Sequence, residues 1–425
     1  MTLTRVRWLA LQITRKLWFR SAVLSGVAVA TALVAVWAQH LIPADMPARI
    51  GADAVDSILE ILAASMLAVT IFSVSTVVSA LSAASSQVTP RATRLLIQDP
   101  TAHNALGTFL GAFLFSLVGI IALSTGVYGE RGRVVLFAVT LLVVLLIVVT
   151  LLRWIDHVSR MGRVADSTGR VEDATAKALR ERHRHPWLDG RPLAEPAPPP
   201  PPGAWPLPPR GIGYVQHIDM PALDALAQAN GLRIRICALP GTFTEPSRPL
   251  AVVTGQCGET VRDELCAAFS IGDLRSYDQD PRFGLAVLSE IAQRGLSPAL
   301  NDPGTAIDVI GRQVRLLALW ATPVAAQGRA PRFPHVEVPG IAVDDLFDDA
   351  FAAIARDGAA MVEVGVRLQK ALQALARMGD QRFRRAAGRL SGMALAQARH
   401  AGIIAADLEV LDGLAQDLAA TLRVG

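Results

Sequence analysis

The chain has 425 residues, of which 52% are hydrophobic and 18% are charged, and its formal net charge is +4. This length predicts two to three domains and leaves room for a water-soluble core beside any membrane part. The cations flank apolar stretches instead of forming one basic stripe, so composition and charge exclude nucleic acid as the expected partner.

Four apolar stretches crowd into residues 21–153, whereas the rest of the chain alternates charged and apolar residues. Each provides roughly the twenty apolar residues that cross a ~30 Å hydrocarbon layer as a helix. The predicted spans are Ser21–Ile42, Ser57–Ala83, Leu106–Val127 and Val134–Leu152. We therefore expect a transmembrane domain of about four helices over residues 21–153 in a lipid bilayer, preceded by an interfacial amino-terminal segment over residues 1–20.

Arginines in the short connecting segments set the predicted orientation. The amino terminus, the second loop and the segment after the fourth span are rich in arginine. The two remaining loops carry Arg49 in one case and Arg131 with Arg133 in the other. The positive-inside rule therefore places both termini in the cytoplasm.

The second span carries more hydroxyl groups than its neighbours. At about 100° per residue, four of its serines fall within roughly 60° of one another. This serine face consists of Ser75, Ser79, Ser82 and Ser86. Hydroxyls can solvate an ion or water, which favours a pore-lining role. Small residues also let helices approach closely, which favours a helix interface. Both interpretations require the serine face to point into protein rather than lipid.

Two arginines follow the second span at its predicted cytoplasmic edge. Arg91 and Arg94 are spaced to share one helix face. Together they could collect anions at a pore mouth. The alternative interpretation is that they anchor the chain at the membrane interface, as the positive-inside bias requires.

A polar stretch continues beyond the fourth span. It predicts a helical cytoplasmic extension, assigned to residues 154–185, which stops near His185 because Pro186 disfavours a helical conformation in the residue before it. Residues 186–210 are dominated by proline and read as a semi-rigid spacer that joins neither a sheet nor a helix. The chain beyond this linker is predicted to form a second domain.

The second domain is predicted to be α/β at first and then mostly α-helical. Over residues 211–278, short alternating runs interleave with two capped helical patterns, which predicts a small α/β subdomain. Residues 279–425 read as a mostly helical cytoplasmic domain. The predicted fold class is thus a membrane α-helical domain with a cytoplasmic α/β and then helical domain.

A short pattern recurs as Gln98-Asp99-Pro100, Gln279-Asp280-Pro281 and Asn301-Asp302-Pro303. In each copy, Asp is predicted to cap a helix whose first residue is Pro. The third copy lies in a denser polar setting, with the candidate residues Ser297, Asn301, Asp302 and Thr305. A helix start of this kind can receive a small ligand or a neighbouring loop, whereas capping alone predicts a structural corner.

The sequence contains no phosphate-binding loop, nucleophile elbow or paired-histidine metal motif. We therefore expect no catalytic residues, no metal, no cofactor and no enzymatic activity. Asp156 and His157 follow the fourth span, where either a proton relay or an ordinary juxtamembrane polar pair would fit.

Two stretches resemble a known family: Ser85-Ser86-Gln87-Val88-Thr89-Pro90-Arg91 leading to Gln98-Asp99-Pro100, and Leu296-Ser297-Pro298-Ala299-Leu300-Asn301-Asp302-Pro303-Gly304-Thr305-Ala306. With the four early spans and Gly213-Tyr214-Val215-Gln216-His217-Ile218-Asp219, they resemble the bacterial predicted membrane protein family labelled domain of unknown function twenty-two fifty-four. The resemblance covers nearly the whole chain except the proline-rich linker. It implies a protein of the bacterial inner (plasma) membrane and brings no established activity.

Two functions are compatible with these features. The first is a homo-oligomeric pore or transport protein, in which the second span lines the pathway and the cytoplasmic domain assembles or gates it. The second is a membrane-anchored sensor or scaffold that binds a small ligand or a protein near Asn301–Thr305.

Overall fold

The computed structural model describes residues 4, 8, 13–14, 17–38, 52–97, 99–125, 130–322 and 330–423. The chain divides into two compact units. Residues 10–167 form the first, which we call the bundle. Residues 1–9 and 168–425 form the second, which we call the mixed unit because it contains both sheets and helices.

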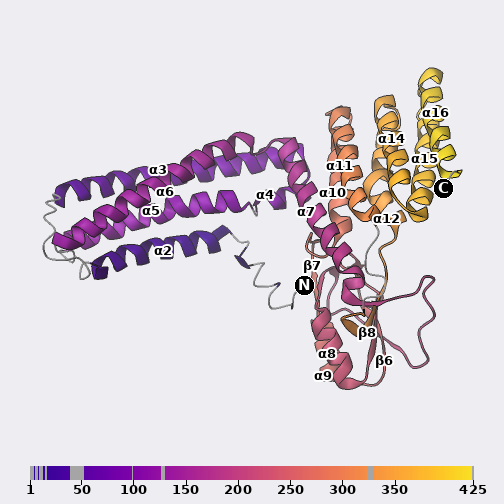
Figure 1. Ribbon diagram of the computed structural model, residues 1–425, viewed down its shortest axis with the longest axis horizontal. Coiled ribbons are helices and arrows are strands. Elements are labelled where there is room, and N and C mark those ends of the chain that lie inside the picture. Colours follow the sequence, from indigo (N-terminus) through magenta and orange to yellow (C-terminus); the bar gives the residue numbers. More distant parts are fainter. Residues whose placement is uncertain are drawn as a thin grey trace. The chain divides into compact units, whose positions relative to one another are not determined.

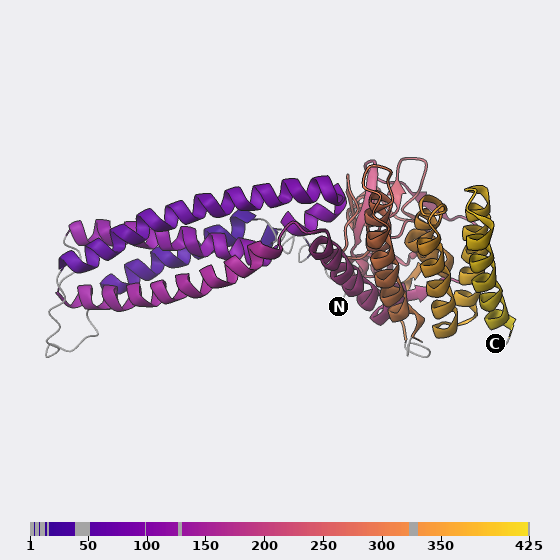
Figure 2. The same ribbon diagram turned by 90° about the horizontal axis from the view of Figure 1, so that it is seen from above.

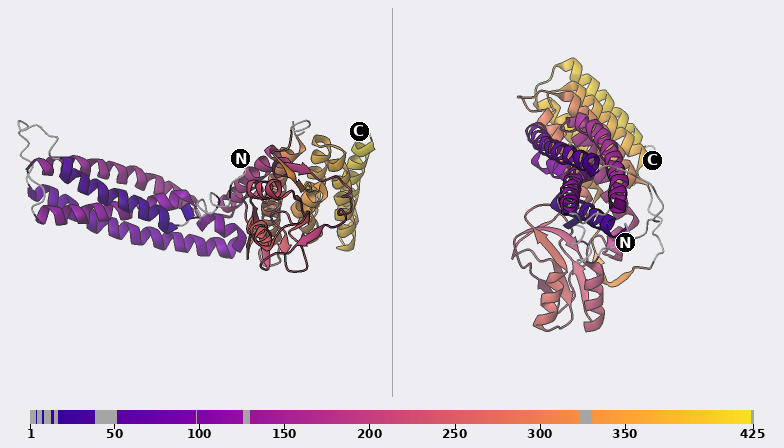
Figure 3. Two further views of the ribbon diagram at one scale, coloured as in Figure 1. Left: turned by 90° about the horizontal axis from the view of Figure 1, so that it is seen from below. Right: turned by 90° about the vertical axis from the view of Figure 1, so that its left-hand side faces the viewer.

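Long helices running side by side make up the bundle (Figures 1, 2 and 3). Each predicted span lies in one of them, as far as the described residues reach. A short helix, α4, lies between the second and third. The bounds are Leu17–Ala38 for α2, Ala52–Gln87 for α3, Pro90–Ile97 for α4, Pro100–Ser124 for α5 and Glu130–Arg160 for α6.

Among the described residues, three helices are long and apolar enough to cross a membrane. Their apolar segments are Ala54–Ser85, Pro100–Ser124 and Gly132–Arg160. In α2 the apolar segment is shorter and runs from Phe19 to Val34. A crossing needs about 20 apolar residues, so the structure supports three of the predicted spans, and the fourth crossing stays a prediction.

Small residues bring α2 and α5 into close contact. A Cβ atom on Gly107 of α5 would lie 2.7 Å from Cδ1 of Leu24, and one on Gly111 would lie 3.3 Å from the Leu24 carbonyl oxygen. Two clusters of buried apolar side chains fill the rest of the bundle, one around Phe115 and the other around Phe109. The bundle is therefore held by close backbone approach and by apolar packing.

The helical extension predicted over residues 154–185 is in fact divided between two helices. α6 ends at Arg160, and α7 begins at Val164 and ends at Arg184. Gly162 lies between them with a φ of +84°, a left-handed conformation that glycine adopts without steric cost. The helix does end just before His185, as the following proline predicts.

Two sheets form the α/β part of the mixed unit. The five-stranded sheet has the order β1-β8-β4-β6-β2, and the three-stranded antiparallel sheet has the order β5-β3-β7. β8 runs parallel to β1 and β4, whereas β6 is antiparallel to β4 and β2. The strands are Gly190–Pro192, Trp205–Leu207, Gly213–Ile218, Arg233–Ile236, Phe243–Thr244, Ala251–Thr254, Phe269–Gly272 and Phe333–Val338, from β1 to β8.

The prediction that residues 186–210 join no sheet is wrong. β1 and β2 both lie in this segment, and they form the two edges of the five-stranded sheet. Proline lacks an N–H donor, but an edge strand needs donors on one side only. Pro192 of β1 and Pro206 of β2 therefore occupy positions that a central strand would not tolerate. The proline-rich segment is thus part of the mixed unit rather than a spacer before it.

The helical prediction beyond residue 279 missed one strand. β8 lies between β1 and β4, so the sheet is completed by a segment far from its other strands. Pro334 argues against a central strand, but pairing to β4 begins beyond it, at Val336 and Glu337. The backbone N–H of His335 bonds instead to Asp224 of α8, at 2.9 Å.

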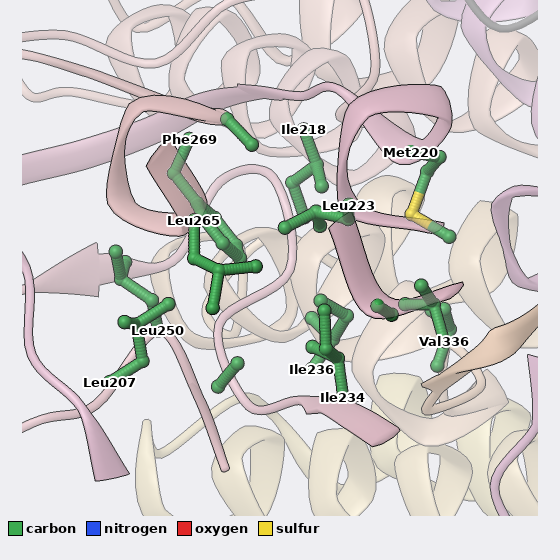
Figure 4. Close-up of a cluster of buried hydrophobic side chains, with 14 of the residues drawn as sticks. Leu207, Ile218, Met220, Leu223, Ile234, Ile236, Leu250, Leu265, Phe269 and Val336 are labelled. Carbon is green, nitrogen blue, oxygen red and sulfur yellow. The ribbon is translucent and has the colours of Figure 1, made fainter. Parts of the chain in front are cut away.

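The core of the α/β part lies between the strands and the helices α8, Met220–Asn230, and α9, Glu259–Ala267. Figure 4 shows Leu223 of α8 and Leu265 of α9 among strand residues such as Ile234 and Ile236. Asp219 caps α8 by accepting from the Ala222 N–H, and Gly231 ends the helix in a left-handed conformation.

Most of α7 and the helices from α10 to α16 form the rest of the mixed unit. The segment predicted to be mostly helical is divided near Gly358 and near Gly402, where φ is +71°. The bounds are Pro281–Gly295 for α10, Pro303–Ala321 for α11, Val343–Phe347 for α12, Ala353–Asp357 for α13, Val362–Met378 for α14, Gln381–His400 for α15 and Ala405–Arg423 for α16. A π-helical turn over Asp348–Ala352 joins α12 to α13.

Candidate functional site

The serine face lies on the outer surface of the bundle. Ser75, Ser79 and Ser82 are exposed in the single chain, whereas Met66 and Ser73 on the opposite side of α3 are buried. The side chain of Ser86 lies outside the described residues. This outward direction follows from helix geometry, because positions four and seven residues apart lie on the same side of a helix. Within one chain, the three described serines therefore face away from the other helices.

Two close approaches between helices show how far along the bundle the serine face lies. A Cβ atom on Gly119 of α5 would lie 3.0 Å from Leu59 of α3 and 3.8 Å from Leu136 of α6. A Cβ atom on Gly162, just after α6, would lie 3.4 Å from the Ala80 carbonyl oxygen of α3. α3 and α6 therefore run in the same direction, with Leu59 level with Leu136 and Ala80 level with Gly162.

These contacts place the serines at one end of the apolar zone. The apolar stretch of α6 ends at Leu152, and the exposed Arg153 follows it. Counting residues along α6 from Leu136 puts Arg153 level with residue 76 of α3, and counting back from Gly162 puts it level with residue 71. Ser75 is thus at the edge of the apolar zone, and at about 1.5 Å per residue Ser79 and Ser82 lie roughly 6 and 10 Å beyond it.

α4 carries the two arginines of the predicted mouth. The Thr89 hydroxyl accepts from the Ala92 N–H at 3.3 Å and so caps this short helix. Arg91 is exposed and Arg94 is half-buried. Acidic and basic side chains are absent from α3 between Glu60 and its end at Gln87, so these arginines provide the charge that follows the serine face.

A polar pair that the sequence did not reveal joins α5 to α6. His157 Nε2 lies 2.7 Å from Asp99 Oδ2, with side-chain exposures of 15% and 2%. Asp156, the expected neighbour of His157, instead pairs with Arg160 at 2.8 Å. The other carboxylate oxygen of Asp99 accepts from the Thr101 N–H, so one side chain caps α5 and binds α6. An aspartate cap and a distant histidine were visible in the sequence, but nothing in it paired them.

All three Asp-Pro motifs cap helices as predicted. Asp99, Asp280 and Asp302 cap α5, α10 and α11, and each is followed by proline at the first helical position. Their surroundings differ. The Asp280 carboxylate is 2% exposed and bonds both Nε and Nη2 of Arg275, at 2.7 and 3.0 Å.

Burial dominates the electrostatics around Asp280. It raises the pKa of the Asp280 carboxyl, against the opposing effect of Arg275. It also lowers the pKa of Arg182 of α7 to about 10, although the Asp280 charge opposes this. Arg182 donates to the Gln279 carbonyl at 2.9 Å, and the Gln279 side chain accepts from the Ile218 N–H of β3. This motif therefore joins α7, α10 and β3 as a structural centre.

The candidate corner at residues 297–305 uses its polar groups internally. Asp302 accepts from the Thr305 N–H at 3.1 Å and from the Thr305 hydroxyl at 2.6 Å. These hydrogen bonds lower the pKa of the Asp302 carboxyl. The Ser297 hydroxyl donates to the Arg294 carbonyl, and Asn301 adopts a left-handed φ of +46°. The corner thus brings all four predicted residues together, and Leu300 stays 50% exposed.

Sequence reasoning also missed a contact made by Trp8. Its indole nitrogen donates to Asp278 Oδ2 at 3.0 Å, and its ring stacks on His217 with centroids 5.3 Å apart. The interfacial segment predicted for residues 1–20 lies mostly outside the described residues. Across the described ranges, no three histidine, cysteine or acidic side chains are arranged to hold a metal ion.

Fold and site together define a predicted membrane protein whose apolar helices carry a mixed α/β and helical unit. Residues 14–374 match the model of the family described as Predicted membrane protein (DUF2254), and the chain belongs to this family. Uncharacterized proteins of Mycobacterium bovis and Mycobacterium tuberculosis are 27% identical to it over 262 residues, which is 60% of this chain. The chain spans about half the length of these curated relatives. No solved structure gives a significant match.

Proposed function

We propose that this protein is a homo-oligomeric pore or transport protein in which α3 helices of neighbouring copies face one another. The observation that carries the proposal is the outward serine face, Ser75, Ser79 and Ser82. The activity requires no chemical reaction, cofactor or metal.

The two exposed helix faces of the bundle differ in chemistry. The outward face of α6 presents large aliphatic side chains, including Leu142, Leu145 and Leu152, each more than half exposed. Lipid tails cover such a face well. The end of α3 presents serines beside the exposed Val74 and Val78. Small hydroxylated residues suit a close helix neighbour or water. A second copy of α3 meets that need, because the other helices of the same chain lie behind it.

A pathway between neighbouring chains also agrees with the interior of each bundle, which is filled by apolar side chains. Phe109, Phe115 and Leu136 are among the fully buried side chains there. A route through one chain would have to displace them, whereas a route between chains leaves them in place. The serine face would then line one end of the route, at and beyond the edge of the apolar zone.

The charge at this end favours anions as the permeant class. Arg91 and Arg94 follow the serine face on α4, and no charged side chain of α3 lies between Glu60 and these arginines. Positive side chains at a narrow mouth raise the local anion concentration. The positive-inside rule puts this end in the cytoplasm, with the mixed unit on the same side as an assembly or gating domain.

The test is chloride efflux from liposomes that contain the full chain. Ser79→Trp and Ser82→Trp should each lower efflux about tenfold, equivalent to about 1.4 kcal/mol of added barrier. Val74→Trp is the matched control, since Val74 is exposed on the same helix but about 100° from Ser75. Absence of efflux from the unmodified protein under every ion gradient would contradict the pore.

Assembly is tested separately by cysteine cross-linking. In a variant whose Cys237, Cys257 and Cys266 are replaced by serine, Ser79→Cys should form a disulfide-linked dimer in the membrane. Val74→Cys should do so much less. Equal cross-linking at both positions would contradict an α3–α3 interface.

A second candidate function is that of a membrane-anchored sensor or scaffold that binds through residues 297–305. It is supported by the internally hydrogen-bonded corner, in which Leu300 stays half-exposed. Because the polar groups bond one another, a protein partner suits this corner better than a small ligand. Leu300→Asp should abolish capture of such a partner without changing efflux, whereas unchanged capture would remove the site.

A further inference from the structure

Trp8 is buried against the mixed unit although it precedes the first apolar helix. Only 6% of its surface is exposed, and its ring lies at 20° to the ring of the fully buried His217. Stacked aromatic rings stabilise a contact beyond the effect of the apolar area that they bury. The hydrogen bond from the indole N–H to Asp278 is charge-assisted and so stronger than a neutral one.

The recess that receives Trp8 is built from two rigid elements. His217 belongs to β3, and the next residue, Ile218, is fixed by its bond to the Gln279 side chain. Asp278 is held by Ser276, whose hydroxyl donates to the carboxylate and accepts from the Asp278 N–H, both at 3.2 Å. A flat ring beside a fixed acceptor matches an indole, which offers one apolar face and one donor.

The chain passes between the two units at two places, after Leu9 and after Ser167. The second place lies within the first turn of α7, which begins at Val164. The first lies between Trp8 and α2, which begins at Leu17. Trp8 is therefore held in the mixed unit with only eight residues of sequence between it and the start of α2.

We propose that the recess formed by His217 and Asp278 is the docking site for the chain's own amino-terminal segment, with Trp8 as its anchor, and that this anchor transmits movements of the mixed unit to α2. The docking stands on the contacts of Trp8 alone. The transmission rests on the proposed pore function, because it assumes that movements of the mixed unit gate a pathway formed by the bundle.

Docking is measured by fluorescence in the full chain in lipid nanodiscs. A bimane label on Leu274→Cys, an exposed position four residues before Asp278, should be quenched in a variant whose three native cysteines are replaced by serine, because tryptophan quenches bimane on contact. Trp8→Phe should remove this quenching. Ile13→Ala is the matched control, since it truncates a 45% exposed apolar side chain of the same segment. Equal emission with and without Trp8 would overturn the docking.

A label-free measurement guards against disturbance of the recess by bimane. Trypsin cleaves after Arg5, Arg7, Arg15 and Lys16, which surround Trp8 in the sequence. Trp8→Ala and Asp278→Asn should each accelerate cleavage at these sites several-fold, whereas Ile13→Ala should not. Unchanged cleavage in both variants would also overturn the docking.

Transmission is measured by chloride efflux from liposomes with the same variants. Trp8→Ala should change the efflux rate several-fold relative to Ile13→Ala while Ser79→Cys cross-linking persists. If the unmodified protein conducts and Trp8→Ala conducts equally well, the transmission is wrong and the docking stands. If the unmodified protein does not conduct, the pore function fails, whereas the fluorescence result still decides the docking.

Discussion

The two units of the molecule satisfy their buried polar groups in different ways. In the mixed unit several of these partners come from different elements. Gln313 of α11 donates to the Leu285 carbonyl of α10 at 2.8 Å, and Ser289 of α10 donates to the Ala350 carbonyl at 2.7 Å. In the bundle, hydroxyls bond back to their own helix. Thr140 donates to the Leu136 carbonyl at 2.7 Å.

The arrangement of the elements is therefore determined differently in the two units. Directional hydrogen bonds between elements fix one arrangement, because a misplaced partner leaves a buried polar group unpaired. Hydroxyls that bond to their own helix allow that helix to move without losing a bond. Besides the Asp99–His157 pair, the helices of the bundle depend on close fits at small residues such as Gly107 and Gly111. We therefore expect the mixed unit to resist rearrangement and the bundle to be adjustable.

The largest expected effect comes from breaking the polar centre of the mixed unit. Asp280→Asn removes a buried charge that faces Arg275 and Arg182, and it leaves these cations without their counter-ion. Breaking a buried ion pair costs about 3–5 kcal/mol. Denaturant unfolding of the full chain in detergent should show this loss in the transition of the mixed unit.

The same motif provides the control. Asp302→Asn changes a cap of identical design in an exposed corner, where asparagine caps as well as aspartate, so the loss should stay within about 0.5 kcal/mol. Equal losses for the two variants would show that the buried arginines contribute nothing beyond capping.

An intermediate effect is expected at the closest helix approach of the bundle. Gly107→Val places a side chain against Leu24 and the Ser21 backbone of α2, and overpacking of this kind costs about 1–3 kcal/mol. Thermal unfolding in detergent measures the loss. Gly26→Val is the control on α2, because a Cβ atom there would meet nothing within 4 Å. A similar loss at both positions would contradict the close fit as the cause.

The smallest effect concerns an ion cluster between α7 and α11. Burial opposes ionisation of Glu172, but hydrogen bonds and charges from Arg315 and Arg312 outweigh it and lower the pKa of this carboxyl. A lowered folded-state pKa gives stability above the unfolded-state pKa, and that stability disappears as pH falls through the folded-state pKa. Glu172→Gln should therefore cost about 0.5–1 kcal/mol at neutral pH and nothing at strongly acidic pH.

The pH dependence of the difference is the decisive measurement for this cluster. Unfolding midpoints of the parent and of Glu172→Gln should converge as the pH falls below 4.5, the ordinary value for the carboxyl. Glu363→Gln, at an exposed position on α14, should show no such convergence. A gap that stays constant with pH would mean that Glu172 acts through packing rather than through its charge.

Local features of the fold could be predicted from the sequence, and long-range pairings could not. The caps at Asp99, Asp280 and Asp302 depend on a few consecutive residues, so the pattern alone identified them. The membership of Pro192 and Pro206 in edge strands depends on distant partners, and composition pointed to a spacer instead. Strand β8 was hidden for the same reason.

The candidate site shows the same division. Helical periodicity grouped Ser75, Ser79 and Ser82 on one face, and the structure places them together. Periodicity does not predict which face of α3 is exposed, because that depends on where α5 packs against it. The pairing of Asp99 with His157, and of Trp8 with Asp278, joins residues far apart in the chain, so no local pattern could reveal either.

The position of β8 has a consequence for biosynthesis. β4 leaves the ribosome long before residues 333–338, and until then its edge lacks the neighbour that covers it in the finished sheet. Open strand edges recruit other chains, so nascent molecules are exposed to aggregation during this interval. Slower translation between the codons of β4 and β8 should therefore lower the yield of native protein, and chaperones that bind extended segments should restore it.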